Sequence, residues 1–206
     1  MERMKIKITF IDDVLGSQPN DAEIYSRFIA SKAPDAKTIE QEVEEFGAVE
    51  VDEKGMTVFA RNAEGQPCMK SYQIKGFFKA ACGALRRVQG TNSAKCKAYK
   101  KVIDDTIFVY PDADNPASRF IPINYDGDIT VCQRPLRAQT MQGERVALAS
   151  SECIGAGASI VFDVEFYNEA DKALICEWLD HGKHNGLSQW RNSGKGAFTW
   201  QELTDQ

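Results

Sequence analysis

The stretch Ala158-Ser-Ile-Val-Phe-Asp-Val-Glu-Phe-Tyr167 alternates strongly between apolar and polar residues. A period of two is typical of a β-strand that buries one of its faces. The buried face is predicted to carry Ile160, Phe162, Val164 and Phe166. Residues 158–167 are therefore predicted to form a half-buried strand of a sheet.

A helix and a loop rich in glycine follow this strand. Asn168 is a favoured N-cap residue, and the helix that it starts has an apolar face and ends at Gly182. Residues 183–196 form what we call the glycine-rich loop, and a final strand is predicted at residues 197–203.

The glycine-rich loop contains no acidic residue. Its glycines are Gly186, Gly194 and Gly196, and its basic residues are Lys183, Arg191 and Lys195. Backbone N–H groups surrounded by basic side chains suit a phosphate group, although glycine is also common in ordinary turns. A phosphate-binding loop and a structural turn are therefore both open interpretations of this segment alone.

The N-terminal part predicts alternating strands and helices. Residues 5–10 alternate like a half-buried strand, and residues 20–46 predict two helical pieces. Two short strands around an Asn-Ala-Glu-Gly turn predict a hairpin within residues 56–72. The clearest helix spans residues 74–88, with one apolar and one basic face.

The middle of the chain is predicted to be rich in short strands. Residues 90–101 are polar and basic and predict a loop, and residues 133–150 show no clear period. Gly76 and Gly83 share a face of the preceding helix, which predicts close backbone packing there. The whole pattern predicts an α+β fold with helices on one face of an antiparallel sheet.

Length and composition are those of a globular protein. The 206 residues predict one domain spanning 1–206, with a β-rich insertion at about 103–150. Six scattered cysteines, with no Cys-x-x-Cys pair and no signal peptide, predict a cytoplasmic protein with reduced thiols and no zinc site. No apolar run is long enough to span a membrane.

Charge is unevenly distributed along the chain, whose net charge is −5. Residues 12–64 contain 13 acidic and 5 basic residues, whereas residues 65–103 contain 9 basic residues and no acid. Such segregation permits one electropositive face on an acidic protein. Sequence blocks need not correspond to surface faces, so this remains one of two interpretations.

Three segments, in this order, resemble motifs of the RAMP superfamily, the RNA-binding proteins that build CRISPR effector complexes. The first is Tyr72-Gln-Ile-Lys-Gly-Phe-Phe-Lys-Ala-Ala81, and the second is Ser151-Glu-Cys-Ile-Gly-Ala-Gly-Ala-Ser-Ile-Val-Phe162. The third is Gly186-Leu-Ser-Gln-Trp-Arg-Asn-Ser-Gly-Lys-Gly196, with Ser188 in place of one family glycine. Residues 24–34 also look like small proteins of phages and prophages, which implies a stand-alone member.

The resemblance implies a ferredoxin-like (RRM-like) sheet that binds single-stranded nucleic acid without catalysis, and RNA is the expected ligand more than DNA. Basic side chains would contact phosphates and an exposed tryptophan would stack on a base. The candidate binding residues are Lys75, Lys79, Arg86, Arg87, Gly186, Trp190, Arg191, Gly194, Lys195 and Gly196. Protein subunits of a nucleoprotein complex, or self-association, are the other expected partners, and no cofactor is expected.

Two alternatives remain open at this point. A phage-encoded mimic of an effector subunit would use its acidic surface to dock on a host defence complex and inhibit it. A metal-independent endoribonuclease would use His181 or His184, the two histidines of the chain, beside the glycine-rich loop. Exposed loop histidines are more common than catalytic ones, so we expect no enzyme.

Pairs of adjacent carboxylates are the remaining candidates for chemistry. Asp12 and Asp13 follow the first strand, and Asp104 and Asp105 precede another. Paired acids can hold a metal ion. Exposed loop carboxylates are the commoner case, and we therefore predict no metal site.

Overall fold

A computed structural model describes residues 1–20, 56–140 and 143–203. The chain divides into two compact units. Unit 1 comprises Met1–Val14, Ala60–Asp128 and Ile154–Gln206, and unit 2 comprises Leu15–Phe59 and Ile129–Cys153. The helices predicted at residues 20–46 and the segment similar to phage proteins lie outside the described residues.

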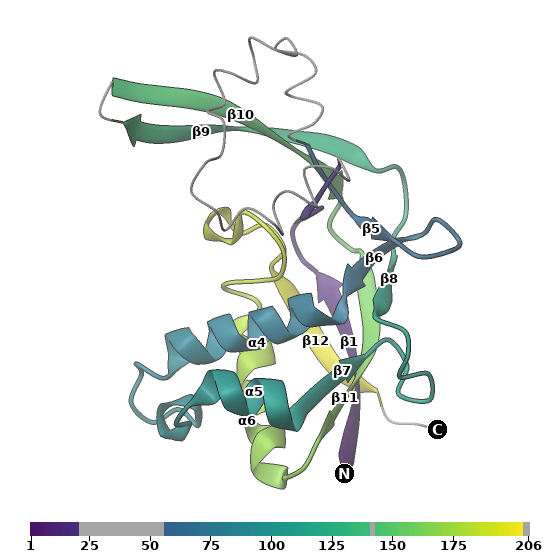
Figure 1. Ribbon diagram of the computed structural model, residues 1–206, viewed down its shortest axis with the longest axis vertical. Helices are drawn as coiled ribbons and strands as arrows, with labels where there is room; N and C mark the ends of the chain where they lie inside the picture. Colours follow the sequence, from purple (N-terminus) through teal and green to yellow (C-terminus); the bar gives the residue numbers. More distant parts are fainter. Residues whose placement is uncertain (21–55, 141–142, 204–206) are drawn as a thin grey trace, which may run out of the picture. The chain divides into compact units, whose positions relative to one another are not determined.

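Unit 1 contains a seven-stranded sheet (Figure 1). Its strands run in the order β12 (Phe198–Leu203), β1 (Glu2–Phe10), β11 (Ser159–Phe166), β8 (Phe120–Asn124), β6 (Pro67–Lys70) and β5 (Ala60–Arg61). A further strand, β7 (Ile107–Tyr110), also pairs with β11. The pairings between these strands are antiparallel.

The alternation seen in the sequence sets which face of the sheet is buried. In β1 and β11 every second side chain is buried, and the register places Ile6 opposite Phe162 and Ile8 opposite Ile160. The predicted buried face of β11 is confirmed, because Ile160, Phe162, Val164 and Phe166 are each 0% exposed. The first strand is likewise confirmed, with three more residues at its start than predicted.

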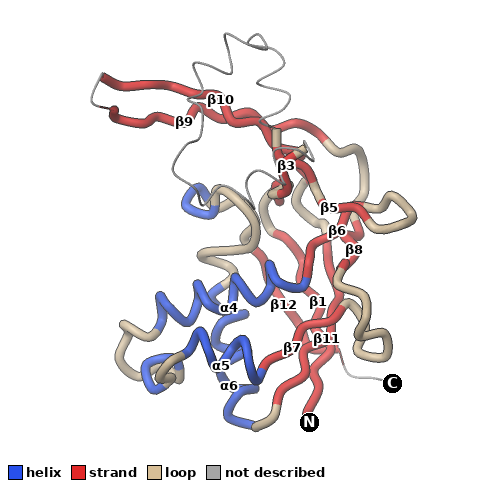
Figure 2. Tube along the Cα trace, viewed as in Figure 1, coloured by secondary structure: helices blue, strands red, loops and turns tan. Residues whose placement is uncertain are grey.

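Three α-helices lie side by side at the buried face of this sheet (Figures 1 and 2). They are α4 (Ser71–Leu85), α5 (Tyr99–Thr106) and α6 (Glu169–His181). The ring of Phe78 on α4 lies 5.5 Å from that of Trp178 on α6, and the Phe77 ring lies 5.2 Å from Phe198 on β12. Aromatic packing therefore joins α4 to α6 and α4 to the sheet.

Two local predictions about helices were wrong. Residues 99–101 belong to α5 rather than to a loop, because the helix buries Ile103 and leaves its lysines outside. Gly76 has nothing within 4 Å of a hypothetical Cβ, so close packing does not explain this glycine. The same prediction is confirmed at Gly83, whose Cβ would lie 3.1 Å from the Tyr99 hydroxyl.

Unit 2 contains a smaller sheet, in which β10 is central. Its strands are β2 (Val14–Leu15), β10 (Gly143–Ile154), β4 (Thr57–Val58) and β3 (Gln18–Pro19), and β9 (Thr130–Thr140) pairs antiparallel with β10. The hydroxyls of Thr57 and Ser151 lie 2.7 Å apart, and Phe59 N donates to Glu152 Oε2 at 2.8 Å. The described residues of the segment without a clear sequence period, 133–140 and 143–150, belong to the paired strands β9 and β10.

The α+β class is confirmed for the described chain, which combines α-helices with mainly antiparallel sheets. The single domain with one insertion at about 103–150 stays a prediction. Residues 103–128 fall in unit 1 and residues 129–150 in unit 2. The predicted insertion thus contributes strands to both units.

Candidate nucleic-acid interface

The second and third sequence motifs meet at the end of β1. Phe10 N donates to Ala158 O, and Gly157 N donates to Phe10 O, both at 2.8 Å. On the other side of the strand, Ile11 N donates to Ala197 O at 2.9 Å. The start of β11 and the end of the glycine-rich loop therefore flank the same strand end in unit 1.

The glycines of the loop close its base. Leu187 N donates to Gly196 O at 2.9 Å, and a Cβ on Gly186 would overlap that carbonyl group. Gly196 and Gly194 have φ of +72° and +90°, which side-chain-bearing residues rarely adopt. These three glycines are therefore required for the closed loop conformation, whatever the loop binds.

Lys195 anchors the loop to the residues that follow β1. Its ammonium group lies 2.9 Å from Asp12 Oδ1 and 2.8 Å from Asp13 Oδ2, and Gly196 N donates to Asp13 O at 2.7 Å. Hydrogen bonds to Asp13 and then Asp12 raise the pKa of Lys195, and the hydrogen bond from Lys195 lowers the pKa of Asp12. Because two carboxylates surround this ammonium, it offers a phosphate no net positive charge.

Trp190 and Arg191 lie midway along the loop, in the part that we call its outer tip, where Trp190 is exposed and Arg191 is half-buried. Trp190 has φ of +56°, lies directly before the short 3-10 helix η2 (Arg191–Ser193), and is 39% exposed. Within the ranges that the structure describes, the Arg191 side chain forms no ion pair or hydrogen bond. An exposed aromatic ring thus lies beside an uncommitted guanidinium group.

The predicted basic face of α4 is partly occupied by contacts with α5. Lys79 Nζ lies 2.6 Å from Asp104 Oδ1, and Lys75 Nζ donates to Asp104 O at 3.1 Å. Lys75 also lies 5.6 Å from the ring of Phe108, and burial lowers the pKa of its ammonium group. These contacts connect α4 to α5 and to β7.

The other two predicted basic residues lie beyond the end of α4. Arg86 stacks its guanidinium group 5.3 Å from the Tyr99 ring, and Arg87 is exposed. Among the described residues, no hydrogen bond or ion pair joins Lys75, Lys79 or these arginines to the glycine-rich loop. The ten predicted residues thus form two separate groups, one on α4 and one on the loop.

The two histidines lie where α6 ends and the loop begins. The His184 side chain is exposed, and the backbone N–H of His184 donates to His181 O at 3.0 Å. Burial, followed by the nearby His184, lowers the pKa of His181. The Nε2 atom of His181 is buried and has no hydrogen-bond partner. A buried ring nitrogen of this kind is poorly placed to reach a bound strand.

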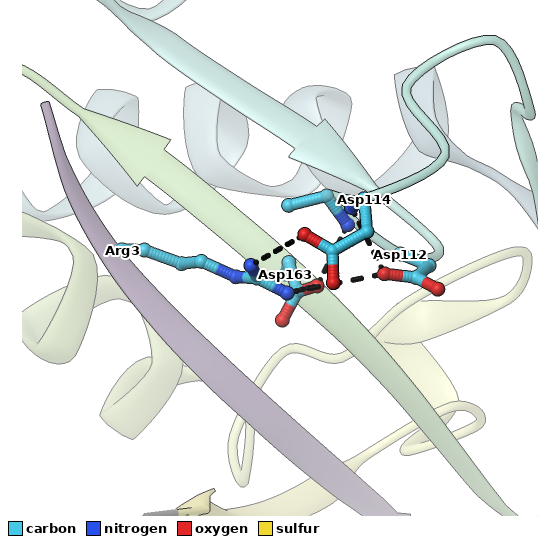
Figure 3. Close-up of polar contacts among 5 residues, drawn as sticks. Arg3, Asp112, Asp114 and Asp163 are labelled. Atoms are coloured by element: carbon cyan, nitrogen blue, oxygen red, sulfur yellow. Dashed lines mark hydrogen bonds and ion pairs between the residues drawn. The ribbon is translucent and has the colours of Figure 1, made fainter. Parts of the chain in front are cut away.

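Sequence reasoning missed an acidic cluster on the open face of the unit 1 sheet, the face opposite the helices. Figure 3 shows Arg3 extending from β1 across β11 to Asp163 and to the loop that follows β7. Arg3 Nη2 lies 2.6 Å from Asp163 Oδ2, which also accepts a hydrogen bond from Ala113 N at 2.8 Å. Asp163 is 0% exposed, and Asp112 and Asp114 lie 3.9 and 3.3 Å from the Arg3 guanidinium.

Two more basic residues lie on this open face. Lys5 and Lys7 alternate with the buried residues of β1, and the register places them opposite Leu203 and Gln201 of β12. Both are half-buried, and neither forms an ion pair within the described residues. Their position on the polar side of an alternating strand was the sequence signal that identifies them.

The carboxylate pairs considered as metal ligands have other partners. Asp12 and Asp13 bind Lys195, and Asp104 binds Lys79. In the described ranges, no group of three or more His, Cys, Asp or Glu side chains is arranged to hold a metal ion. The same ranges contain no helix of the length and apolarity that a membrane span needs.

Comparison with known proteins gives a likeness of fold. No protein-family model matches the chain, and no curated protein matches its sequence. The chain is similar to one in the cryo-EM structure of the type III-B Cmr-beta bound to cognate target RNA, with TM-score 0.52 and 9% identity, over 98% of this chain and 60% of that one. A chain of a type IV-B CRISPR complex is also similar, with TM-score 0.47 and 9% identity, over 98% and 91% of the two chains.

The first of these similarities confirms, at the level of the fold, the resemblance to RAMP proteins. The chain spans about 60% of the length of that Cmr-beta structure's matching chain.

Proposed function

We propose that the protein binds single-stranded nucleic acid, which we expect to be RNA rather than DNA, without cleaving it. The binding surface is the outer tip of the glycine-rich loop together with the open face of the unit 1 sheet. In this proposal unit 1 is a ferredoxin-like domain whose sheet and loop hold one strand. A backbone-contacting surface of this kind binds with little sequence preference.

The observation that carries the proposal is the pairing of Trp190 and Arg191 at the loop tip. A tryptophan that is 39% exposed offers a face for base stacking, which contributes about 1–3 kcal/mol per base. The adjacent Arg191 has no carboxylate partner among the described residues, so its charge is available to a phosphate. The closed loop base and the Lys195 anchor hold both side chains on a defined backbone.

The open sheet face extends this surface. Lys5 and Lys7 lie on β1, two strand positions apart, and neither forms an ion pair within the described residues. Two positions along a strand correspond to about 7 Å, a spacing that allows separate phosphates to be contacted. The fold likeness to a chain from an RNA-bound structure supports the same interpretation.

Fluorescence anisotropy with labelled single-stranded RNA and DNA of equal mixed sequence tests the proposal. We expect RNA binding that weakens as salt increases, with a log–log slope of about −0.7 for each neutralised phosphate. Arg191→Ala should weaken this binding. Its matched control is Lys100→Ala, an exposed change on α5 that removes one positive charge elsewhere. Absent binding, or binding that does not respond to salt, would contradict the proposal.

Association with a protein partner is a second candidate, favoured by an apolar surface in unit 2. Val131 and Leu148 are 55% and 61% exposed, and the strand register of β9 and β10 places them on the same face of the hairpin. The polar pair Gln133 and Ser150 lies between them, so these are two separate exposed apolar side chains on the face that a partner would cover. A complex recovered from lysate after nuclease treatment, and lost in Leu148→Lys, supports this candidate; loss of every partner on nuclease treatment contradicts it.

A further inference from the structure

A polar pocket of about 300 Å³ lies at the end of β8 in unit 1. The pocket is lined by Gln66, Ile123, Asn124, Tyr125, Asp126, Gly157 and Ser159. Its volume is at the lower end of the range of about 300–1,000 Å³ found for small-ligand sites. One planar ring of nucleobase size is the kind of group that such a pocket accepts.

Several polar side chains around this pocket have unused hydrogen-bonding capacity. Within the part of the chain that the structure describes, no hydrogen bond or ion pair engages the side chains of Asn124, Tyr125, Asp126 and Ser159. Gln66 Nε2 donates to Ile123 O at 3.4 Å across the same wall. Convergent polar groups of this kind determine how a ligand is oriented.

The charge of the lining selects the chemistry of the ligand. Asp126 is the only charged residue among those that line the pocket, so a phosphate is disfavoured and a group with N–H donors is favoured. A carboxylate accepts from the exocyclic amine of cytosine, an asparagine side chain pairs with adenine, and a tyrosine ring stacks on any base. Asp126, Asn124 and Tyr125, which line the pocket, are residues of these three kinds.

We infer that this pocket receives an amino-bearing base, cytosine or adenine, of the bound strand. The inference rests on the proposed function and adds base selectivity to it. Asp126 accepts a hydrogen bond from the exocyclic amine, Asn124 pairs with the base edge, and Tyr125 packs on the ring. Uracil, which has a carbonyl oxygen where cytosine has its amine, loses the bond to Asp126.

The pocket and the glycine-rich loop lie at the same end of the sheet. Gly157, in the pocket wall, donates to Phe10 O, and Ala197, directly after the loop, accepts from Ile11 N. The strand order from the loop to the pocket is β12, β1, β11 and β8. Three strand spacings of about 4.8 Å amount to about 14 Å, so a strand held by Arg191 needs only a few nucleotides to reach the pocket.

The test compares oligo(C) with oligo(U) RNA of equal length, because uracil has a carbonyl oxygen at the position of the cytosine amine that Asp126 would read. We expect the wild-type protein to bind oligo(C) about tenfold more tightly than oligo(U). Asp126→Asn and Asn124→Ala together should remove the preference and leave oligo(U) affinity within about twofold of wild type. Asp128→Asn is the matched control, because it removes the same charge from the same turn outside the pocket lining.

The outcomes separate this inference from the proposed function. Equal affinity for the two RNAs, or a preference that survives the double variant, overturns the pocket assignment and leaves the binding surface in place. If Asp128→Asn also removes the preference for oligo(C), the preference is a general charge effect. This result too overturns the pocket assignment. Failure to bind either RNA overturns the proposed function, and the pocket assignment with it.

Discussion

Lys195 Nζ lies 2.8 Å from Asp13 Oδ2, an ion pair that joins the glycine-rich loop to the residues after β1 across 182 positions of sequence. Asp12 completes the contact from the neighbouring position at 2.9 Å. A lysine in a glycine-rich, acid-free segment looks like a phosphate ligand in the sequence, and here it fixes the position of the loop. In our proposal Trp190 and Arg191 are then the loop residues that contact the ligand.

The ion pair predicts a pH-dependent contribution to stability. Lys195→Met should lower the free energy of unfolding by about 1 kcal/mol near neutral pH, because the pair is only partly buried. The lowered pKa of Asp12 means that this contribution is present above its unfolded value of about 3.9 and is lost as pH falls through the folded value. The raised pKa of Lys195 means that the contribution persists above about 10.4 and disappears only at more alkaline pH.

Urea denaturation of wild type and Lys195→Met at neutral and acidic pH measures this difference. The difference in stability between the two proteins should shrink as Asp12 is protonated. A difference that is the same at all pH values would show that Lys195 acts through packing alone.

The closed base of the loop predicts a strict requirement for glycine at position 186. Gly186→Ala should destabilise the protein by about 1–3 kcal/mol, because the new methyl group overlaps the carbonyl of Gly196 and displaces the loop. Gly155→Ala is the control, since a Cβ there has nothing within 4 Å. Thermal unfolding of the two variants decides the matter, and equal melting temperatures would mean that the loop base is open in solution.

The buried carboxylate of Asp163 predicts a large effect of losing its partner. Arg3→Ala should cost about 3 kcal/mol of stability, the lower end of the range for breaking a buried pair, because the Arg3 side chain is 33% exposed and Asp163 is fully buried. Asp114→Ala removes a carboxylate that is 85% exposed and should cost less than about 1 kcal/mol. Denaturant unfolding measures both losses of stability. Equal losses for the two variants would contradict the conclusion that Asp163 is the main partner of Arg3.

The position of His181 predicts a neutral side chain and no RNA cleavage. Burial lowers the pKa of His181, so the folded protein binds this proton less tightly than the unfolded chain, and stability decreases as pH falls below about 6.5. An NMR titration should place the pKa of His181 below its ordinary value of about 6.5. Labelled RNA should remain intact with wild type and with His184→Ala, whereas cleavage that only the wild type performs would establish a nuclease.

Much of unit 1 is predictable from sequence, because its central strands bury one face and therefore alternate. The limits of α5 were missed, since its lysines hide the burial of Ile103 in a polar segment. Gly76 and Gly83 are seven residues apart on one helix, yet only Gly83 meets a neighbour, the Tyr99 hydroxyl. That neighbour belongs to a different element, and local spacing carries no information about it.

The candidate surface was only partly predictable, because some of its contacts come from elements that are distant in the sequence. Trp190 and Arg191 are identified by composition and by the loop motif. The neutralisation of Lys195 depends on Asp12 and Asp13, which were noticed only as an adjacent acid pair near the other end of the chain. The pocket at Asn124 and Asp126 combines three separate segments, and only the sheet order brings them together.

The central claim is that the tip of the glycine-rich loop contacts the backbone of single-stranded RNA. The most direct measurement is the salt dependence of RNA affinity for wild type, Arg191→Ala and the control Lys100→Ala. We predict that Arg191→Ala weakens binding and makes the log–log slope shallower by about 0.7, the loss of one phosphate contact, whereas Lys100→Ala leaves both unchanged. An Arg191→Ala protein with the affinity and slope of wild type would contradict the claim.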